Sequence, residues 1–288
     1  MKQSESGIVL VQVLVIVAFA SAMALTLMTV QDQAVAFERK SGDRLQAQAL
    51  LRGAESSVVS AFRRDGQSGS SVDHYGEAWY LASQVPIDLP QGAFSVSVRD
   101  EQSRFNINNL ANGNLAAKAM FARIVAAAKG DAGWNDRLVA AIALGGPVSD
   151  MSDLAAFGFD ETEITALTSI GCALPDTTTI NLNTASDGLI RALFDNPIAA
   201  GKLLAMRSRE GYVTREDLSE ASLLAPAGTG LTTQFISVEA NVRWNSAGMY
   251  SRTLLARRTD AAGAHVQTIR RITSKKVAAA NPRGSPPL

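Results

Sequence analysis

Residues 8–30 read IVLVQVLVIVAFASAMALTLMTV, and none of these 23 side chains is charged. A helix rises about 1.5 Å per residue, so a helix of this length spans a bilayer core of roughly 30 Å. The uncharged run extends further, from Ser6 to Gln31, and it lacks the polar stripe of a helix that packs on a soluble core. The sequence therefore predicts one membrane-spanning helix.

Three interpretations of this run agree with its chemistry. A cleaved signal peptide could use the small residues at 20–22 or 22–24, although the apolar run continues beyond both sites. A plain anchor would stay uncleaved. The third interpretation takes residues 1–7 as a polar leader that ends at Gly7, because a small residue at the membrane face admits the peptide bond before Ile8 to a protease. The sequence favours the leader and leaves the other two open.

The whole chain of 288 residues is apolar and electrically balanced. Hydrophobic residues make up 47%, and 27 basic residues match 27 acidic ones, which argues against a protein dominated by nucleic-acid binding. With one cysteine, Cys172, and two histidines, His74 and His265, a disulfide framework within the chain is excluded and a Cys/His zinc site is disfavoured. No phosphate loop and no Ser/His/Asp set can be nominated, so we predict no catalysis and no certain cofactor.

The predicted helix continues outside the membrane. Residues 32–63 contain no proline, and Leu51, Ala54, Val58 and Phe62 recur at the spacing of one helix face. We expect the outer half of the helix to pack through this stripe. Residues 66–76 have the composition of a loop.

Strands flank a helical block in the rest of the chain. Apolar and polar residues alternate, as in half-buried strands, at 92–100, 105–110, 236–244, 250–258 and 265–272. Helical character is found at 115–144, 150–167 and 187–207. The simplest architecture is an α+β domain with an all-helical insertion. The alternative, two consecutive domains, requires residues 93–110 to pair with something other than 234–272.

Four stretches together resemble a known family. They are the amino terminus with Gly7 and a non-acidic Gln12 at the fifth position from Ile8, VRDEQSRFNINNL at 98–110, DMSDL at 150–154, and CALPDTTTINLNTAS at 172–186. The chain resembles the general secretion pathway protein K family, the large minor pseudopilins of bacterial type II secretion systems. Two departures are Ser103, where the family usually has glycine, and a missing acidic and tyrosine-rich stretch between the second and third matches.

The resemblance implies a pilin-like α+β fold, in which a long amino-terminal helix packs on an antiparallel sheet with a large all-helical domain inserted. The implied parts are a leader at 1–7, the transmembrane half of the helix at 8–31, its outer half and the first strands at 32–111, the inserted domain at 112–215, the remaining strands at 216–276 and a disordered tail at 277–288. The family-motif residues are Arg104, Phe105, Asn106, Asn108, Asn181, Asn183 and Thr184.

The resemblance also implies a function in assembly. Such proteins sit at the tip of a short periplasmic pseudopilus with other minor pseudopilins, in the bacterial inner membrane as single-pass proteins with most of the chain in the periplasm. The prepilin peptidase would cleave after Gly7 and methylate Ile8. Gln12 replaces the usual glutamate that pairs with a neighbouring amino terminus, which suits a tip subunit. Some relatives have a calcium site, but no dense acidic loop names its ligands here, so the metal ligands are unknown.

Residues 180–186 also resemble the start of a helix-hairpin-helix DNA-binding module, which would make the chain a single-span DNA-uptake-like protein. Such modules place two glycines at the hairpin, where backbone amides meet phosphate, whereas 194–201 has one late glycine and an acidic residue. No nucleic-acid partner is expected. The final strands are basic, and they predict either a solvated face or a docking face for an acidic partner: Arg243, Arg252, Arg257, Arg258, Arg270, Arg271, Lys275, Lys276 and Arg283.

Overall fold

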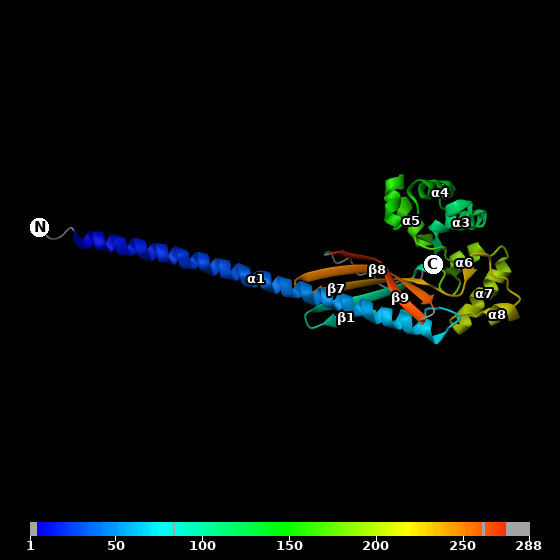
Figure 1. Cartoon of the computed structure of the whole chain (residues 1–288), viewed down its shortest axis with the longest axis horizontal. Coiled ribbons are helices and arrows are strands. Elements are labelled where there is room, and N and C mark those ends of the chain that lie inside the picture. Colours follow the sequence, from blue (N-terminus) through cyan, green and yellow to red (C-terminus); the bar gives the residue numbers. More distant parts are fainter. Residues whose placement is uncertain (1–4, 83, 261–262, 275–288) are drawn as a thin grey trace.

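The structure, a computed structural model, describes residues 5–82, 84–260 and 263–274. It combines one long helix, a five-stranded sheet and an insertion that lies at the opposite end of the molecule from the start of the helix (Figure 1). Helix α1 spans Glu5–Ser68 and ends before Gly69, whose φ of 73° is left-handed. The predicted loop therefore begins later than residue 66. The last turn of α1 remains helical where Asp65 pairs with Arg257 on the sheet.

The five-stranded sheet contains strands from before and after the insertion in the sequence. Its order is β1-β2-β7-β8-β9, and each neighbouring pair is antiparallel. Strand β2 pairs with β7 from Gly92 opposite Trp244 to Asp100 opposite Ile236. An early strand thus pairs with the late meander, which confirms a single α+β domain with an insertion and rules out two consecutive domains. The strands are β1 (Gln84–Leu89), β2 (Gly92–Asp100), β7 (Phe235–Trp244), β8 (Ala247–Asp260) and β9 (Gly263–Ser274).

Helix α1 covers one face of this sheet. Its predicted stripe is buried there together with alternate residues of β2 and β7, so one apolar cluster joins helix and sheet. The main members are Leu51, Ala54, Val58, Phe62, Val96, Val98, Ile236, Val238, Ala240 and Val242. The short helix α2 (Ala78–Leu81) adds Trp79, whose ring meets Phe62 edge-on at 5.9 Å between centroids. Because the stripe first becomes buried at Ala47, the sheet covers α1 only from there to its end at Ser68.

The insertion occupies the chain between β2 and β7. Its helices are η1 (Glu101–Ser103), η2 (Ile107–Gly113), α3 (Leu115–Ala127), α4 (Trp134–Gly145), η3 (Met151–Phe157), α5 (Glu161–Ile170), α6 (Asp187–Leu193), α7 (Pro197–Glu210) and α8 (Arg215–Glu220). It also contains the short strands β3 (Phe105–Asn106), β4 (Gly171–Cys172), β5 (Ile180–Asn181) and β6 (Thr229–Gly230). These strands form two parallel pairs, β3 with β4 and β5 with β6, so the insertion is not all-helical as expected.

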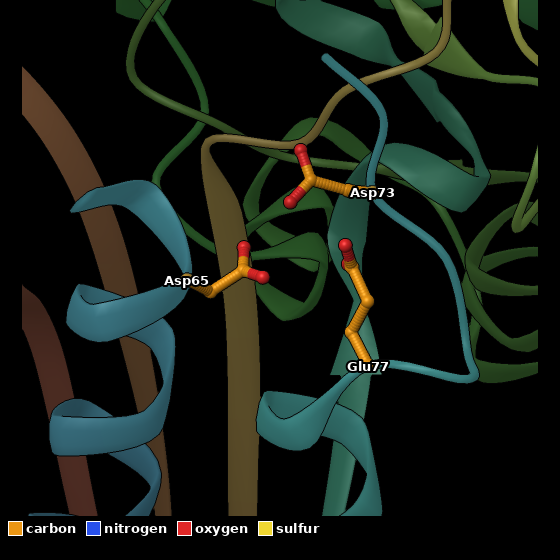
Figure 2. A group of neighbouring side chains, drawn as sticks. All are labelled: Asp65, Asp73 and Glu77. Atoms are coloured by element: carbon orange, nitrogen blue, oxygen red, sulfur yellow. The ribbon is translucent and has the colours of Figure 1, made fainter. Parts of the chain in front are cut away.

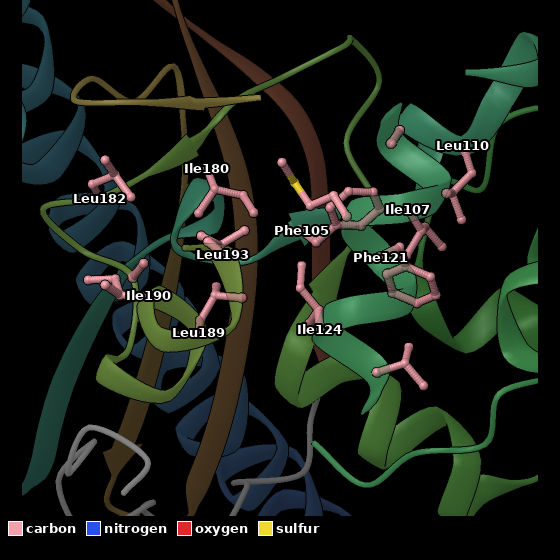
Figure 3. Packing of buried hydrophobic residues seen from close by; sticks show 14 of the residues in the cluster. Phe105, Ile107, Leu110, Phe121, Ile124, Ile180, Leu182, Leu189, Ile190 and Leu193 are labelled. Atoms are coloured by element: carbon pink, nitrogen blue, oxygen red, sulfur yellow. The ribbon is translucent and has the colours of Figure 1, made fainter. Parts of the chain in front are cut away.

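One buried apolar cluster runs through the insertion (Figure 3). Phe105 enters it from β3 and packs against Phe121 of α3, with ring centroids 5.0 Å apart. Ile190 and Leu193 of α6 belong to the same cluster. The helical block therefore has a core of its own, separate from the cluster under α1.

Three sequence predictions need correction. The strand predicted at 105–110 ends at Asn106, because the Asn106 side chain accepts a hydrogen bond from the Asn108 amide and begins a 3-10 helix. Strand β1 was not predicted, since Pro86 interrupts it and restricts it to an edge. Strands of the sheet resume at Phe235 rather than near 216, where α8 lies. The predicted tail at 277–288 and the start of the predicted leader lie outside the described residues.

Candidate functional site

The amino-terminal half of α1 presents an uninterrupted apolar surface. From Val9 to Val30 every side chain is exposed, and the helix is long and apolar enough to cross a membrane. The hydroxyls of Ser21, Thr26 and Thr29 donate to main-chain carbonyls three or four residues earlier. Because these bonds satisfy the polar groups within the helix, the segment suits lipid. It is consistent with the predicted single-pass anchor.

The residues predicted for processing lie at the start of this helix. Gly7 and Ile8 belong to its first turn, and Gln12 lies on its exposed surface. Their positions place the predicted cleavage bond directly before the apolar segment. Cleavage and methylation themselves stay predictions.

Between the membrane segment and the sheet, α1 remains uncovered. Val35, Phe37 and Leu45 are 50%, 69% and 66% exposed, although each is a large apolar residue. This stretch of α1, residues 32–46, also carries six charged side chains, so its exposed surface is mixed. The three exposed apolar side chains nevertheless offer contacts to a second helix.

The family-motif residues gather where the insertion leaves the sheet. Arg104 is buried; its guanidinium pairs with Glu101 and donates to the carbonyl of Thr168 in α5 at 2.6 Å. Its neighbour Phe105 is a core residue of the insertion. Both side chains therefore tie the exit from β2 to the helices of the insertion.

At the same exit from β2, the side chains of two asparagines bond to main-chain groups of other segments of the insertion. The side chain of Asn106 accepts from the Leu174 amide at 3.1 Å and donates to the Asp176 carbonyl at 2.7 Å. The side chain of Asn108 accepts from the Val148 amide and donates to the Val148 carbonyl, both at 2.9 Å. A side-chain amide carries both a donor and an acceptor, so each asparagine binds a strand-like segment as a peptide group would.

The second motif, at 181–184, bonds the insertion back to the junction with the sheet. Asn181 donates to the carbonyl of Asp73 and to the Asp100 carboxylate, both at 3.0 Å. Asn183 bonds both the amide and the carbonyl of Val213. The Asn181 side chain also accepts from the Asn183 amide at 3.0 Å, which holds the turn between them, and the next helix is capped by Ser186, whose hydroxyl accepts from Leu189 N at 3.3 Å.

Asp100 is the centre of this junction, and sequence reasoning did not single it out. Its buried carboxylate accepts four hydrogen bonds: from Gln102 N at 2.8 Å, Thr233 Oγ1 at 2.5 Å, Thr184 Oγ1 at 2.6 Å and Asn181 Nδ2 at 3.0 Å. Burial raises the pKa of Asp100 to about 6, although these bonds oppose the rise. The only signal in the sequence was an acidic residue at the end of an alternating strand.

Three carboxylates meet beside this junction: Asp65 at the end of α1, Asp73 in the following loop and Glu77 before α2 (Figure 2). Oxygen atoms of the three lie within 4.8 Å of one another, a spacing that could hold a metal ion. The Arg257 guanidinium, however, lies 2.6 Å from both Asp65 Oδ2 and Asp73 Oδ1. Because Arg257 already supplies the positive charge and calcium prefers six to eight oxygen ligands, these three carboxylates do not fit a calcium ion.

The basic strands are largely neutralised by acidic partners within the chain. Besides Arg257, the pairs are Arg258 with Asp176, Arg270 with Asp150, and Arg271 with Glu55. The hypothesis of a broad basic docking face is therefore wrong for these positions, since their charges hold the insertion and α1 on the sheet. Lys275, Lys276 and Arg283 lie outside the described residues.

The cysteine and the two histidines all have partners within the fold. Cys172 is buried, and burial raises the pKa of its thiol, which makes it a poor nucleophile. His74, which follows α1, stacks on Tyr212 with ring centroids 4.2 Å apart. For His265, Asp260 Oδ2 lies 3.5 Å from its Nδ1.

Comparisons with known proteins agree with this geometry. The family model described as type II secretion system (T2SS), protein K matches residues 180–239, the segment that runs from β5 through α8 into β7. Type II secretion system protein K of Pseudomonas aeruginosa (strain PAO1) is 27% identical over 262 residues, which cover 76% of this chain and 78% of that protein. The chain is similar to type II secretion system protein K.

The fold agrees with a solved structure of this class. A chain in the crystal structure of the GspK-GspI-GspJ complex from the enterotoxigenic Escherichia coli type 2 secretion system matches with a TM-score of 0.60. The match covers 83% of this chain and 99% of that one at 19% identity, so it shows a shared fold. The segment matched by the protein K family model includes Asn181, Asn183 and Thr184, whose contacts in the structure are to the chain's own sheet and insertion. The DNA-binding alternative finds no support in these comparisons.

Proposed function

We propose that the chain is a minor pseudopilin at the tip of the periplasmic pseudopilus of a type II secretion system, where it initiates or caps assembly together with other minor pseudopilins. The observation that carries the proposal is the exposed length of α1, which is apolar through the membrane segment and then presents the large apolar side chains of Val35, Phe37 and Leu45 among charged ones. A helix of this kind can leave lipid when partner helices replace the lipid contacts. The solved complex that shares the fold contains three different proteins, which supports partners of the same class.

The place of the insertion supports the tip position. It lies beyond the end of the sheet that is farthest from the start of α1 (Figure 1). Subunits that stack by parallel long helices add along the helix direction, and a bulky domain at that end would obstruct a further subunit above it. Gln12 fits the same position, since a subunit without a neighbour on that side has no amino terminus to pair with a carboxylate.

The same proposal includes processing of the amino terminus. The prepilin peptidase would cut between Gly7 and Ile8 and methylate Ile8, leaving the anchor in the bacterial inner membrane and the sheet with its insertion in the periplasm. The protein would then be a substrate of that peptidase with no catalysis of its own. Amino-terminal sequencing of mature protein tests this part: Ile8 as the first residue supports it, whereas Met23 or Leu25 refutes it.

Assembly is tested by a pull-down of residues 32–288 with the periplasmic parts of candidate minor pseudopilins. The first residue of the three buried apolar clusters is Ala47, so this fragment retains all of them. Phe37→Ala should weaken the interaction at least tenfold, because Phe37 lies on the open surface of α1. Leu144→Ala removes an apolar side chain of the insertion that is 85% exposed, against 69% for Phe37, and is the control. Equal loss in both variants, or binding that neither changes, argues against α1 as the assembly surface.

A further inference from the structure

The side of helix α1 that faces away from the sheet is basic where the helix lies along the sheet (Figure 1). Arg52, Arg63 and Arg64 are exposed there, and none of them forms an ion pair with another residue that the structure describes. Nε of Arg64 donates to the carbonyl of Ser60 at 3.3 Å, one turn earlier in the helix, which leaves the charge of its guanidinium without a counterion. This face therefore carries positive charge that the fold itself does not use.

The carboxylates of α1 do not neutralise this face. Between residues 44 and 68 the acidic residues of the helix are Glu55 and Asp65. Both are bonded to arginines of the sheet, Glu55 to Arg271 and Asp65 to Arg257 at 2.6 Å. Since these two carboxylates are engaged on the sheet side, the outward side keeps an excess of positive charge, and such a face is complementary to an acidic partner.

The spacing of the arginines suits a helix that lies alongside α1. Arg52 and Arg63 are eleven residues apart, close to three turns, so they share one side of the helix at a separation of roughly 16 Å. The exposed residues between them are small: Gly53, Ser56 and Ser57. A second helix can therefore lie close to α1 while both guanidinium groups bond to its carboxylates, each through two parallel hydrogen bonds.

This face lies too far from the membrane to serve lipid headgroups. At about 1.5 Å per residue, Arg52 is roughly 33 Å beyond Val30, the last residue of the apolar segment. Headgroups extend only about 5–8 Å beyond the hydrocarbon core, and a tilt of 40° would still leave the Arg52 backbone about 25 Å above that core. The acidic partner is therefore another protein.

Given the proposed function, on which this step rests, we propose that the face of α1 between Arg52 and Arg63 docks a helix of another minor pseudopilin. That helix carries two carboxylates about three turns apart, one for each arginine. It contacts α1 beyond the stretch at 32–46, along the part of the helix whose other side is covered by the sheet.

The test measures the affinity of residues 32–288 for the periplasmic part of the candidate minor pseudopilin that this fragment captures, at low and at physiological salt. Arg52→Glu combined with Arg63→Glu should weaken binding at least tenfold, because like charges then face each other, and it should abolish the loss of affinity with added salt. Arg191→Glu combined with Arg215→Glu makes the same charge change at two exposed positions of the insertion and should leave the affinity within about twofold of wild type.

A charge swap identifies the partner residues. Acidic residues about three turns apart on the long helix of the partner are replaced by lysine, two at a time. One such pair should restore binding to the Arg52→Glu, Arg63→Glu variant, because the two ion pairs are then re-formed with their signs exchanged.

Gly53→Leu tests the close approach of the two helices without changing any charge. A Cβ at Gly53 meets nothing within 4 Å, and leucine favours a helix more than glycine does, so this variant should be at least as stable in urea as the wild type. It should nevertheless weaken binding at least tenfold, since the added side chain holds the partner helix away from α1.

The proposal is overturned if the Arg52→Glu, Arg63→Glu variant or Gly53→Leu binds as the wild type does, if the insertion control loses as much affinity, or if no lysine pair restores binding. It is also overturned if phosphatidylglycerol vesicles bind the fragment through the same two arginines. Phe37→Ala separates this failure from that of the proposed function. Weakened binding in Phe37→Ala with full binding in the arginine variant removes the basic face alone, whereas a wild-type fragment that captures no candidate removes both.

Discussion

Replacing Asp100 with asparagine should remove part of the pH dependence of folding stability. Burial raises the pKa of Asp100 from 3.8 to about 6 in the folded chain. As the pH falls, the folded chain therefore takes up this proton near pH 6, whereas the unfolded chain does so only near pH 4. Between these values the folded state binds more protons, so the free energy of unfolding rises as the pH falls and is lost again as the pH rises through 6.

The folded and unfolded pKa values of Asp100 differ by about two, and each pKa unit corresponds to 1.36 kcal/mol. The free energy of unfolding of the wild-type chain should therefore rise by about 3 kcal/mol through this residue as the pH falls from 7 to 4. The asparagine side chain of the variant cannot ionise and gains none of it. It also turns an acceptor into a donor. Thr184 or Thr233 can accept from the new amide, but one buried N–H, on Gln102 or Asn181, loses its acceptor, which costs about 1–3 kcal/mol at every pH.

The assay is urea unfolding of residues 32–288 at several pH values, followed by tryptophan fluorescence, which reports on the buried Trp79. Asp65 and Asp73, whose pKa values are also raised by burial, contribute equally to both proteins and cancel in the difference. Asp88→Asn changes an exposed carboxylate on β1 and is the control. Parallel stability curves for wild type and Asp100→Asn from pH 4 to 7 would show that Asp100 does not carry this proton.

Three further predictions concern core, ion pairing and processing. Phe105→Ala should lower the free energy of unfolding by about 3–5 kcal/mol in the same urea assay, since it empties a fully buried site, whereas Phe37→Ala should change it by less than about 0.5 kcal/mol. Arg257→Gln should cost about 3–5 kcal/mol because it leaves buried Asp73 without a cation, and a neutral effect would mean that another group compensates. Gly7→Val should block processing on a gel by crowding the cleavage bond, and normal maturation of this variant contradicts the leader assignment.

The long helix and the meander could be predicted because their patterns are local. Leu51, Ala54, Val58 and Phe62 define one helix face whatever they pack against, and alternation over 236–244 defines a strand face. Pairing of β2 with β7 was one of two options in the sequence, and only the structure decided between them.

The junction could not be predicted in the same way. The junction is held by contacts between residues more than 80 positions apart in the sequence: Asn181 and Thr233 bond to Asp100, and Arg257 pairs with Asp73. A periodic sequence pattern describes only neighbouring residues, so it cannot predict such contacts. The clustered arginines of the final strands suggested a basic surface. In the structure they instead pair with acidic residues that are scattered through α1 and the insertion. Asn181 was visible as part of a motif, but its bond to Asp100 was not.

The proposed function places this chain at one end of the assembled pseudopilus. The most direct measurement is gold labelling of an affinity tag on the exposed end of α7 in isolated pseudopili, viewed by electron microscopy. We expect label at one end of each filament, at about one copy per filament. Label distributed along the filaments, or filaments of normal number and length that lack the protein altogether, would contradict it.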